Sequence, residues 1–164
     1  MTLTIEETRT TARPAAVLVR GVSLLFTGLF SGFLLGVLVL ENSLRAYDAS
    51  VYAQVRLVEL DSLDKLASAT LIPALVSTVI VTILARGNNR WLLLALALLI
   101  VVFAVSLAVN LPINGDQADW SVQAPPADWA TVRDHWQLAH LIRTVAAVSA
   151  FGSLIVAGLT RRRD

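Results

Sequence analysis

Four long runs without a charged residue divide this chain and leave few folds open to it. They are residues 21–40, 66–85, 91–111 and 144–160, with lengths of 20, 20, 21 and 17 residues. A helix needs about 20 such residues to cross the ~30 Å hydrocarbon core of a bilayer. The sequence therefore predicts an all-α integral membrane four-helix bundle, a single domain over residues 1–164. The predicted spans lie near residues 17–40, 63–86, 91–111 and 132–160.

Arginines gather at one set of ends of these runs. They precede the first run, fill the short connection between the second and third, and follow the fourth: Arg9, Arg13, Arg20, Arg86, Arg90, Arg161, Arg162 and Arg163. The other two connections are acidic and carry Glu41, Asp48, Glu59, Asp61, Asp64, Asp116, Asp119, Asp128 and Asp134. The positive-inside rule then predicts a multi-pass cell-membrane protein whose N- and C-termini are cytoplasmic. Residues 1–15 are predicted to be a flexible cytoplasmic tail.

Composition excludes several function classes. The formal net charge is only +1, which gives no indication of a nucleic-acid partner. The chain has no cysteine, so disulfides, thiolate metal ligands and cysteine nucleophiles are all excluded.

The two outer connections differ in character. The first, residues 41–65, has helical character, which predicts an extra helical segment at the membrane surface or over the bundle, with Asp61 as the N-cap of the second span. The second, residues 112–128, contains three prolines and no period, so it is predicted to be a loop that acts as a lid or binding loop. Asp128 is the predicted N-cap of a final helix that runs from Trp129 to Thr160.

A polar stripe lies on this final helix. Trp129, Arg133, Trp136, His140 and Arg143 follow one another at steps of four, three, four and three, which keeps them on one face. Arg143 lies a turn deeper than His140, within the apolar zone, where an arginine is costly unless it faces a cavity or a partner. The stripe is predicted to line a pocket at the outer mouth of the bundle.

Residues on other spans reach the same depth. Counting from the cytoplasmic arginines at ~1.5 Å per residue places Glu41, Lys65, Asn110 and His140 at one level, about 30 Å up the bundle. Glu41 has two open readings. It is either an ion-pair partner of Arg133 or Arg143, or a metal ligand beside His140.

Small residues repeat along the first span. Gly28, Gly32 and Gly36 share a face that lets another helix approach closely in lipid. Such a face predicts tight packing within the bundle, or a homo-oligomer formed through it.

The segment from Asn110 to Arg143 resembles a known family. Asn110-Leu111-Pro112-Ile113-Asn114, a variable stretch, and then Trp129, Arg133, Trp136, His140 and Arg143 resemble the DUF1772 family of small four-span membrane proteins, which includes the anthrone oxygenases.

This resemblance implies oxidation of an apolar, polyketide-like aromatic substrate by O2, giving a quinone. His140 would be the base, because it alone on the stripe has an ordinary pKa near neutrality. Arg133 and Arg143 would hold a phenolate or peroxide, and these two with His140 form the expected catalytic set. Trp129 and Trp136 would offer flat binding surfaces, with Asn110 and Asn114 orienting substrate oxygens.

Two alternatives stay open. In the first, the oxidation depends on a transition metal, copper or iron, held by Glu41 and His140; in the main reading no cofactor is needed. In the second, the protein is a non-catalytic membrane subunit or scaffold whose stripe binds a lipid, a quinone or a partner helix.

Overall fold

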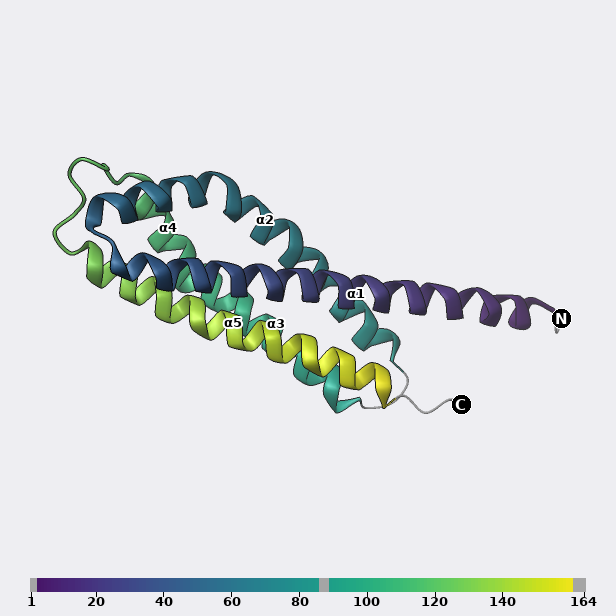
Figure 1. The fold of residues 1–164 in the computed structure, drawn as a ribbon. Coiled ribbons are helices and arrows are strands. Elements are labelled where there is room, and N and C mark those ends of the chain that lie inside the picture. Colours follow the sequence, from purple (N-terminus) through teal and green to yellow (C-terminus); the bar gives the residue numbers. More distant parts are fainter. Residues whose placement is uncertain (1–2, 86–88, 161–164) are drawn as a thin grey trace.

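The protein is an all-helical bundle over the residues that the structure, a computed structural model, describes: residues 3–85 and 89–160, with side chains from residue 15 (Figure 1). The long helices are α1 (Leu3–Ser43), α2 (Ala49–Leu84), α3 (Arg90–Val105) and α5 (Trp129–Leu159). Short elements are a 3-10 turn at Leu44–Ala46, a π-helical turn at Ser106–Asn110 and α4 (Leu111–Ala118).

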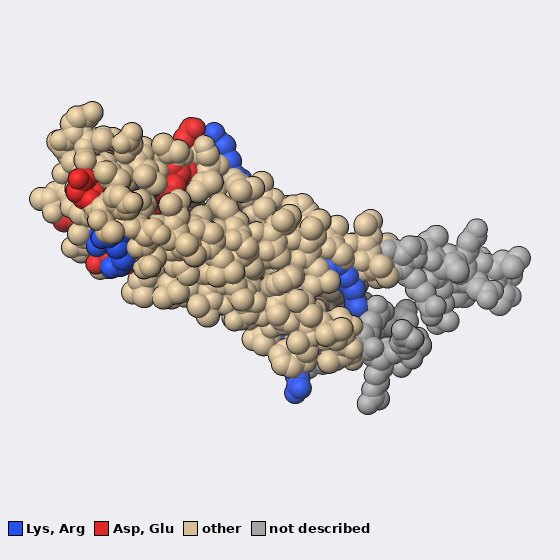
Figure 2. Space-filling view, in the orientation of Figure 1, with Lys and Arg blue, Asp and Glu red and all other residues tan. Residues whose placement is uncertain are grey.

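Four stretches of this bundle are long and apolar enough to cross a membrane. They are Ala15–Ala46, Ala49–Leu84, Arg90–Ala118 and Trp129–Leu159, which confirms the expected four helices of sufficient length and apolarity. The second begins well before residue 63, and the first and third continue past residues 40 and 111. The start of α1 and the end of α5 lie at the same end of the bundle (Figure 1). On the face drawn in Figure 2, acidic atoms appear at the opposite end, and the middle of the bundle carries no charge. Arg9, Arg13, Arg86 and Arg161 to Arg163 lie outside the described side chains.

The four long helices pack in a ring. α1 contacts α2 and α5, and α3 contacts the same two helices. Alanines at positions 146, 147, 150 and 157 form much of the buried face of α5, where they pack with Leu34, Leu99 and Val102. Because lipid tails are as apolar as leucine, such small residues favour association by allowing close packing rather than by removing surface from water.

The glycine face divides between two environments. A Cβ added at Gly28 would lie 3.1 Å from the ring of Phe151, so this glycine serves the contact between α1 and α5. Gly32 and Gly36 are exposed, and a Cβ there would meet nothing within 4 Å. Close packing is therefore confirmed at Gly28, and an oligomer through the other two glycines stays a prediction.

The first outer connection is helical, but the structure joins it to the second span. α2 begins at Ala49, where the Asp48 carboxylate accepts the N–H groups of Ser50 and Val51, each at 3.0 Å. Asp61 lies inside this helix, so its predicted N-cap role is wrong. The added turns stay on the bundle because Tyr52, fully buried, packs against Trp129 and Trp120 with ring centroids 5.5 and 6.3 Å apart.

The third span also continues beyond its predicted end. Pro112 has no N–H to donate, and its ring crowds the carbonyl group four residues earlier. That carbonyl belongs to the π turn at Ser106–Asn110, whose wider backbone relieves the steric clash. The chain then continues as α4. The prediction of a loop over residues 112–128 is therefore wrong for residues 112–118. The turn matters because it aims Asn110, Asn114 and Gln117, all buried, into the bundle.

The final helix agrees closely with its prediction. It starts at Trp129 and ends at Leu159. Asp128 is the N-cap by position, but its side chain makes no capping hydrogen bond; its carbonyl accepts the N–H groups of Thr131 and Val132. At the other end of the chain, the backbone of residues 3–14 belongs to α1. The flexibility of the 1–15 tail stays a prediction.

Candidate functional site

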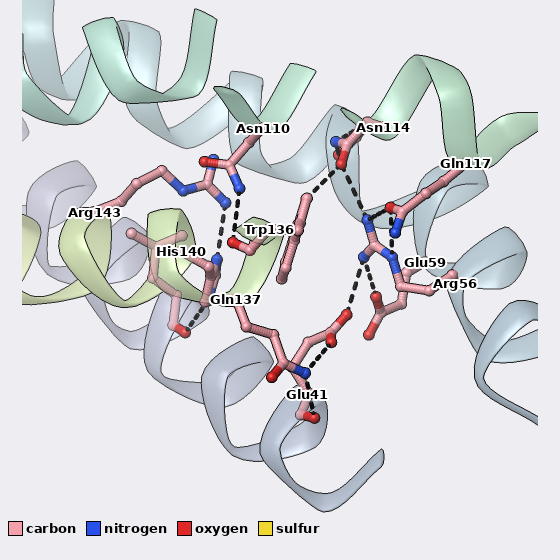
Figure 3. A network of polar contacts seen from close by, with 12 residues as sticks. Glu41, Arg56, Glu59, Asn110, Asn114, Gln117, Trp136, Gln137, His140 and Arg143 are labelled. Carbon is pink, nitrogen blue, oxygen red and sulfur yellow. Dashed lines mark hydrogen bonds and ion pairs between the residues drawn. The ribbon is translucent and has the colours of Figure 1, made fainter. Parts of the chain in front are cut away.

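A cluster of buried polar side chains lies in the half of the bundle nearer the 119–128 connection (Figure 3). α1 supplies Glu41, α2 supplies Arg56 and Glu59, and α5 supplies Trp136, Gln137, His140 and Arg143. The π turn and α4 add Asn110, Asn114 and Gln117. A membrane interior has no water to satisfy such groups, so they bond to one another.

Trp136 and His140 form a parallel stack at the centre of this cluster. They are four residues apart on α5, and their ring centroids lie 4.8 Å apart with planes inclined by 7°. The indole N–H donates to Oδ1 of Asn114 at 2.6 Å, which fixes the ring orientation. The guanidinium carbon of Arg56 lies 4.2 Å from the Trp136 centroid, and Figure 3 shows the indole edge-on between Arg56 and His140. Both flat faces of Trp136 are therefore covered by protein groups.

The contacts of His140 define its tautomer. Its Nε2 lies 3.0 Å from the Leu34 carbonyl oxygen, which can only accept, so Nε2 carries the hydrogen. Its Nδ1 lies 2.9 Å from a guanidinium nitrogen of Arg143, which can only donate, so Nδ1 presents a lone pair. The imidazole is neutral in this arrangement, and its one basic atom faces Arg143.

Arg143 faces the bundle interior, as its depth in the sequence predicts. Besides His140, its guanidinium donates to Oγ of Ser106 at 3.1 Å and lies 5.9 Å from the Trp136 centroid. Its Nε is buried without a hydrogen-bond partner, so the guanidinium retains donor capacity.

Arg56 is the hub of the cluster. It donates to Oε1 of Gln117 at 2.8 and 3.1 Å and to Oδ1 of Asn114 at 3.0 Å. Its Nη1 contacts two carboxylates, Glu41 at 3.2 Å and Glu59. The residue is 2% exposed, so these contacts replace nearly all of its hydration. Truncation would leave several buried acceptors unpaired.

A small cavity of about 30 Å³ opens beside these groups. Its polar wall consists of Arg56, Glu59, Asp64, Trp136, His140 and Arg143, and its apolar wall of Phe33, Val37, Leu63 and Ala67. This volume is on the order of one water molecule. A larger cavity of about 70 Å³, beside Arg20, Ser23 and Leu24, shares none of these residues.

Comparison with known proteins shows the family of this chain. The sequence profile of a family described as anthrone oxygenase matches residues 63–153, which are 91 of the 164 residues. The chain belongs to the anthrone oxygenase family. The matched region contains Trp136, His140 and Arg143, whereas Glu41, Arg56 and Glu59 lie outside it. No curated protein and no solved structure matches the chain.

The inner half of the predicted stripe lines the cavity. Trp136, His140 and Arg143 contact it directly. Asn114 lies behind them, bonded to Trp136, Arg56 and Asp64. The Asn110 amide donates to the Trp136 carbonyl at 3.3 Å.

The outer half of the stripe forms a separate group. The guanidinium carbon of Arg133 lies 4.9 Å from the Trp129 ring centroid, and Arg133 pairs with the exposed Asp134 at 3.0 Å. Neither Trp129 nor Arg133 lines the cavity.

Glu41 and Lys65, two of the four residues predicted to lie at one level, have other surroundings than predicted. Glu41 does form an ion pair, but with Arg56 rather than with Arg133 or Arg143. Lys65 is exposed, and its neighbour Asp64 takes the inward position, accepting from the Asn114 amide at 3.0 and 3.1 Å.

The arrangement of the His, Asp and Glu side chains does not support the alternative in which Glu41 and His140 bind a metal. Among the described residues, no three His, Asp or Glu side chains gather as a metal site would require. Glu41 contacts Arg56 and Gln137, while both His140 nitrogens have protein partners. The Glu41–His140 site therefore stays a prediction, and no step below uses it.

Four residues of the cluster were not predicted from the sequence: Arg56, Glu59, Gln117 and Gln137. A signal for the first three exists, since Tyr52, Arg56 and Glu59 follow at steps of four and three, as do Asn110, Asn114 and Gln117. The prolines of residues 112–128 favour a loop interpretation there, and residues 41–65 are predicted as a helical segment separate from the second span, so neither set was expected to face the bundle interior.

Proposed function

We propose that this protein is a membrane oxygenase that oxidises an anthrone-type, electron-rich apolar aromatic with O2. One observation carries the proposal: in a chain of the anthrone oxygenase family, the neutral His140 presents its basic Nδ1 to Arg143 beside a partly open cavity. A base and a fixed cation at one point are what the formation and stabilisation of a phenolate require.

The first half of the reaction needs only these groups. His140 Nδ1 removes one proton from the activated methylene carbon, and the resulting electron pair is delocalised onto the phenolate oxygen. This anion reduces O2 and forms a carbon–oxygen bond, giving a peroxide that takes the proton back from His140. Each step conserves protons and electrons, and no flavin or metal is required.

Arg143 links substrate binding to base activation in this proposal. A substrate oxygen competes with His140 for the guanidinium, whose Nε is still unpartnered. When Arg143 turns to the substrate, the lone pair on Nδ1 becomes free to accept the proton. The base is thus exposed only when substrate is present.

The apolar wall suits a substrate that arrives from the bilayer. Because the cavity of about 30 Å³ is far smaller than a polycyclic ring system, α1 and α2 must separate near Phe33 and Ala67 to admit it. Trp129 and Arg133 would guide substrate at the outer mouth. With the orientation given by the positive-inside rule, the termini would be cytoplasmic and the site would lie near the outer leaflet of the cell membrane.

A second candidate is a non-catalytic subunit that binds a lipid or quinone. The closed stack favours it, because both faces of Trp136 and both nitrogens of His140 are already occupied.

Oxygen uptake and quinone formation with an anthrone, using the detergent-purified protein, decide between the two candidates. His140→Ala should lower kcat/KM by about 100-fold or more, since general bases contribute about 10²–10⁴-fold. His135→Ala is the matched control, because this histidine is exposed on the same helix. Uptake that equals the protein-free rate in the wild type would favour the binding subunit, and full activity in His140→Ala would exclude the base assignment.

A further inference from the structure

The charges around the cavity do not balance. Arg56 and Arg143 face three carboxyl groups, those of Glu41, Glu59 and Asp64. With His140 neutral, the fully ionised cluster would carry one net negative charge. An uncompensated charge inside a membrane protein is costly, so the cluster favours taking up one proton.

Two of the carboxyl groups compete for one nitrogen. Glu41 and Glu59 both contact Nη1 of Arg56, and their side chains are 0% and 5% exposed. Oε1 of Glu59 is buried without a hydrogen-bond partner, and Oε1 of Glu41 has only the 3.2 Å ion pair with Nη1 of Arg56. Because both carboxyl groups contact the same nitrogen, they are neighbours, and a hydrogen bond between them can form only if one of them carries a proton.

The other groups packed around this pair cannot supply the missing charge. Tyr52 on α2, Gln117 on α4 and Gln137 on α5 are neutral, and Gln137 already donates to the other oxygen of Glu41 at 2.9 Å. Asp64 is better compensated, because it is only half-buried, Asn114 donates to both of its carboxylate oxygens, and it shares the cavity wall with Arg143. The extra proton therefore belongs to Glu41 and Glu59.

We propose that Glu41 and Glu59 share one proton at neutral pH, and that Glu59 donates it to the reaction in the cavity. Glu59 is the member of the pair that lines the cavity. The role as a donor rests on the proposed oxygenase function, whereas the shared proton itself follows from the geometry.

The second half of the oxidation needs such a donor. His140 removes the remaining proton from the peroxide-bearing carbon, the O–O bond breaks, and the carbon–oxygen double bond of the quinone forms. The leaving hydroxide takes the proton of Glu59 and departs as water, and the proton on His140 then returns to the carboxyl pair. In total the methylene carbon loses four electrons to O2, one oxygen atom entering the quinone and the other becoming water.

Infrared spectroscopy of the resting protein tests the shared proton without any substrate. The wild type at pH 7 should show the C=O stretch of a protonated carboxyl group, shifted in D2O. The band should disappear in Glu59→Gln and in Glu41→Gln, because either change removes the surplus charge. Asp61→Asn, an exposed site on the same helix, is the control and should keep it. A wild type without the band, or a band that survives in both glutamine variants, overturns the proposal.

Two assays then separate the donor role from the proposed function. Hydrogen exchange at the methylene carbon without oxygen reports the His140 step, and the ratio of quinone formed to O2 consumed reports the second half. Glu59→Gln should retain the exchange, while its ratio falls from one and a hydroperoxide accumulates. Normal exchange with a ratio of one would overturn the donor role alone. No enhanced exchange in the wild type would overturn the oxygenase function and the donor role, leaving the infrared result to decide the shared proton.

Discussion

Arg143 donates a hydrogen bond to Nδ1 of His140 across one turn of α5, at a distance of 2.9 Å. The contact keeps the imidazole neutral, because the lone pair on Nδ1 accepts from the guanidinium while Nε2 donates to the Leu34 carbonyl. It also places a cation where a substrate phenolate would need one. The two residues therefore act as one unit, and the predictions for each depend on the other.

Replacing Arg143 should affect the chemical step. Arg143→Met removes the group proposed to hold the phenolate, so kcat should fall by roughly 10²–10³-fold, the usual cost of losing one such donor. Arg143→Lys keeps the charge and should recover part of that loss. Steady-state kinetics with an anthrone give both values, and an unchanged kcat in Arg143→Met would remove this arginine from the chemistry.

The outer arginine should behave differently from the inner one. Arg133 stacks on Trp129 and pairs with Asp134, away from the cavity. If it acts at the entrance, Arg133→Met should raise KM while kcat stays within about twofold, since loss of binding common to ground and transition states changes KM alone. A drop in kcat as large as that of Arg143→Met would return Arg133 to the catalytic set.

Asn114 should contribute more stability than the single bond to Trp136 suggests. Asn114→Ala leaves the indole N–H unpaired and takes partners from Arg56 and Asp64, so we expect a loss of about 2–3 kcal/mol, near the cost of stranded buried groups. Trp136→Phe removes the indole N–H bond and part of the stacked ring but leaves the contacts of Asn114 with Arg56 and Asp64, and should cost about 1 kcal/mol less. Reversible unfolding in mixed micelles measures both, and a larger loss for Trp136→Phe would contradict this ranking.

Substitutions at Gly28 and Gly32, on one face of α1, test packing within the bundle separately from packing against a second copy. Gly28→Leu should lower the melting temperature, because its Cβ would already lie 3.1 Å from the Phe151 ring and overpacking costs about 1–3 kcal/mol. Gly32→Leu meets open space and should leave the monomer fold intact. Light scattering of the same samples tests the predicted oligomer. Dissociation caused by Gly32→Leu alone would place a second copy against that face.

The stability that the Asp48 cap contributes at the start of α2 should depend on pH. Hydrogen bonds from the Val51 N–H and then the Ser50 side chain lower the pKa of Asp48 below its ordinary value. A depressed pKa in the folded state means that this cap stabilises the protein above the unfolded pKa, about 3.9, and is lost as pH falls through the lower folded value. Asp48→Asn keeps an acceptor without titrating. The difference between the melting temperatures of wild type and Asp48→Asn should therefore change only below about pH 4, and a constant difference down to pH 2 would contradict the assignment.

Much of the architecture could be predicted because membrane spans are local. Uncharged runs, the arginines between them and the steps of the Trp129–Arg143 stripe depend only on helix geometry and bilayer thickness. These same rules identified Trp136, His140 and Arg143 as neighbours of one cavity, and they placed Glu41 and Asn110 at the depth of His140, where both are buried.

What the sequence alone could not determine were the partners across helices. Pairing of Glu41 with Arg56 rather than Arg143 depends on α2 beginning at Ala49, twelve residues before the predicted cap, and on Tyr52 holding those turns against Trp129. The inward position of Asn114 depends on a π turn before Pro112. Helical periodicity states which residues share a face, and packing between helices decides which faces meet. Only the tertiary structure could therefore show three carboxyl groups around two arginines beside His140.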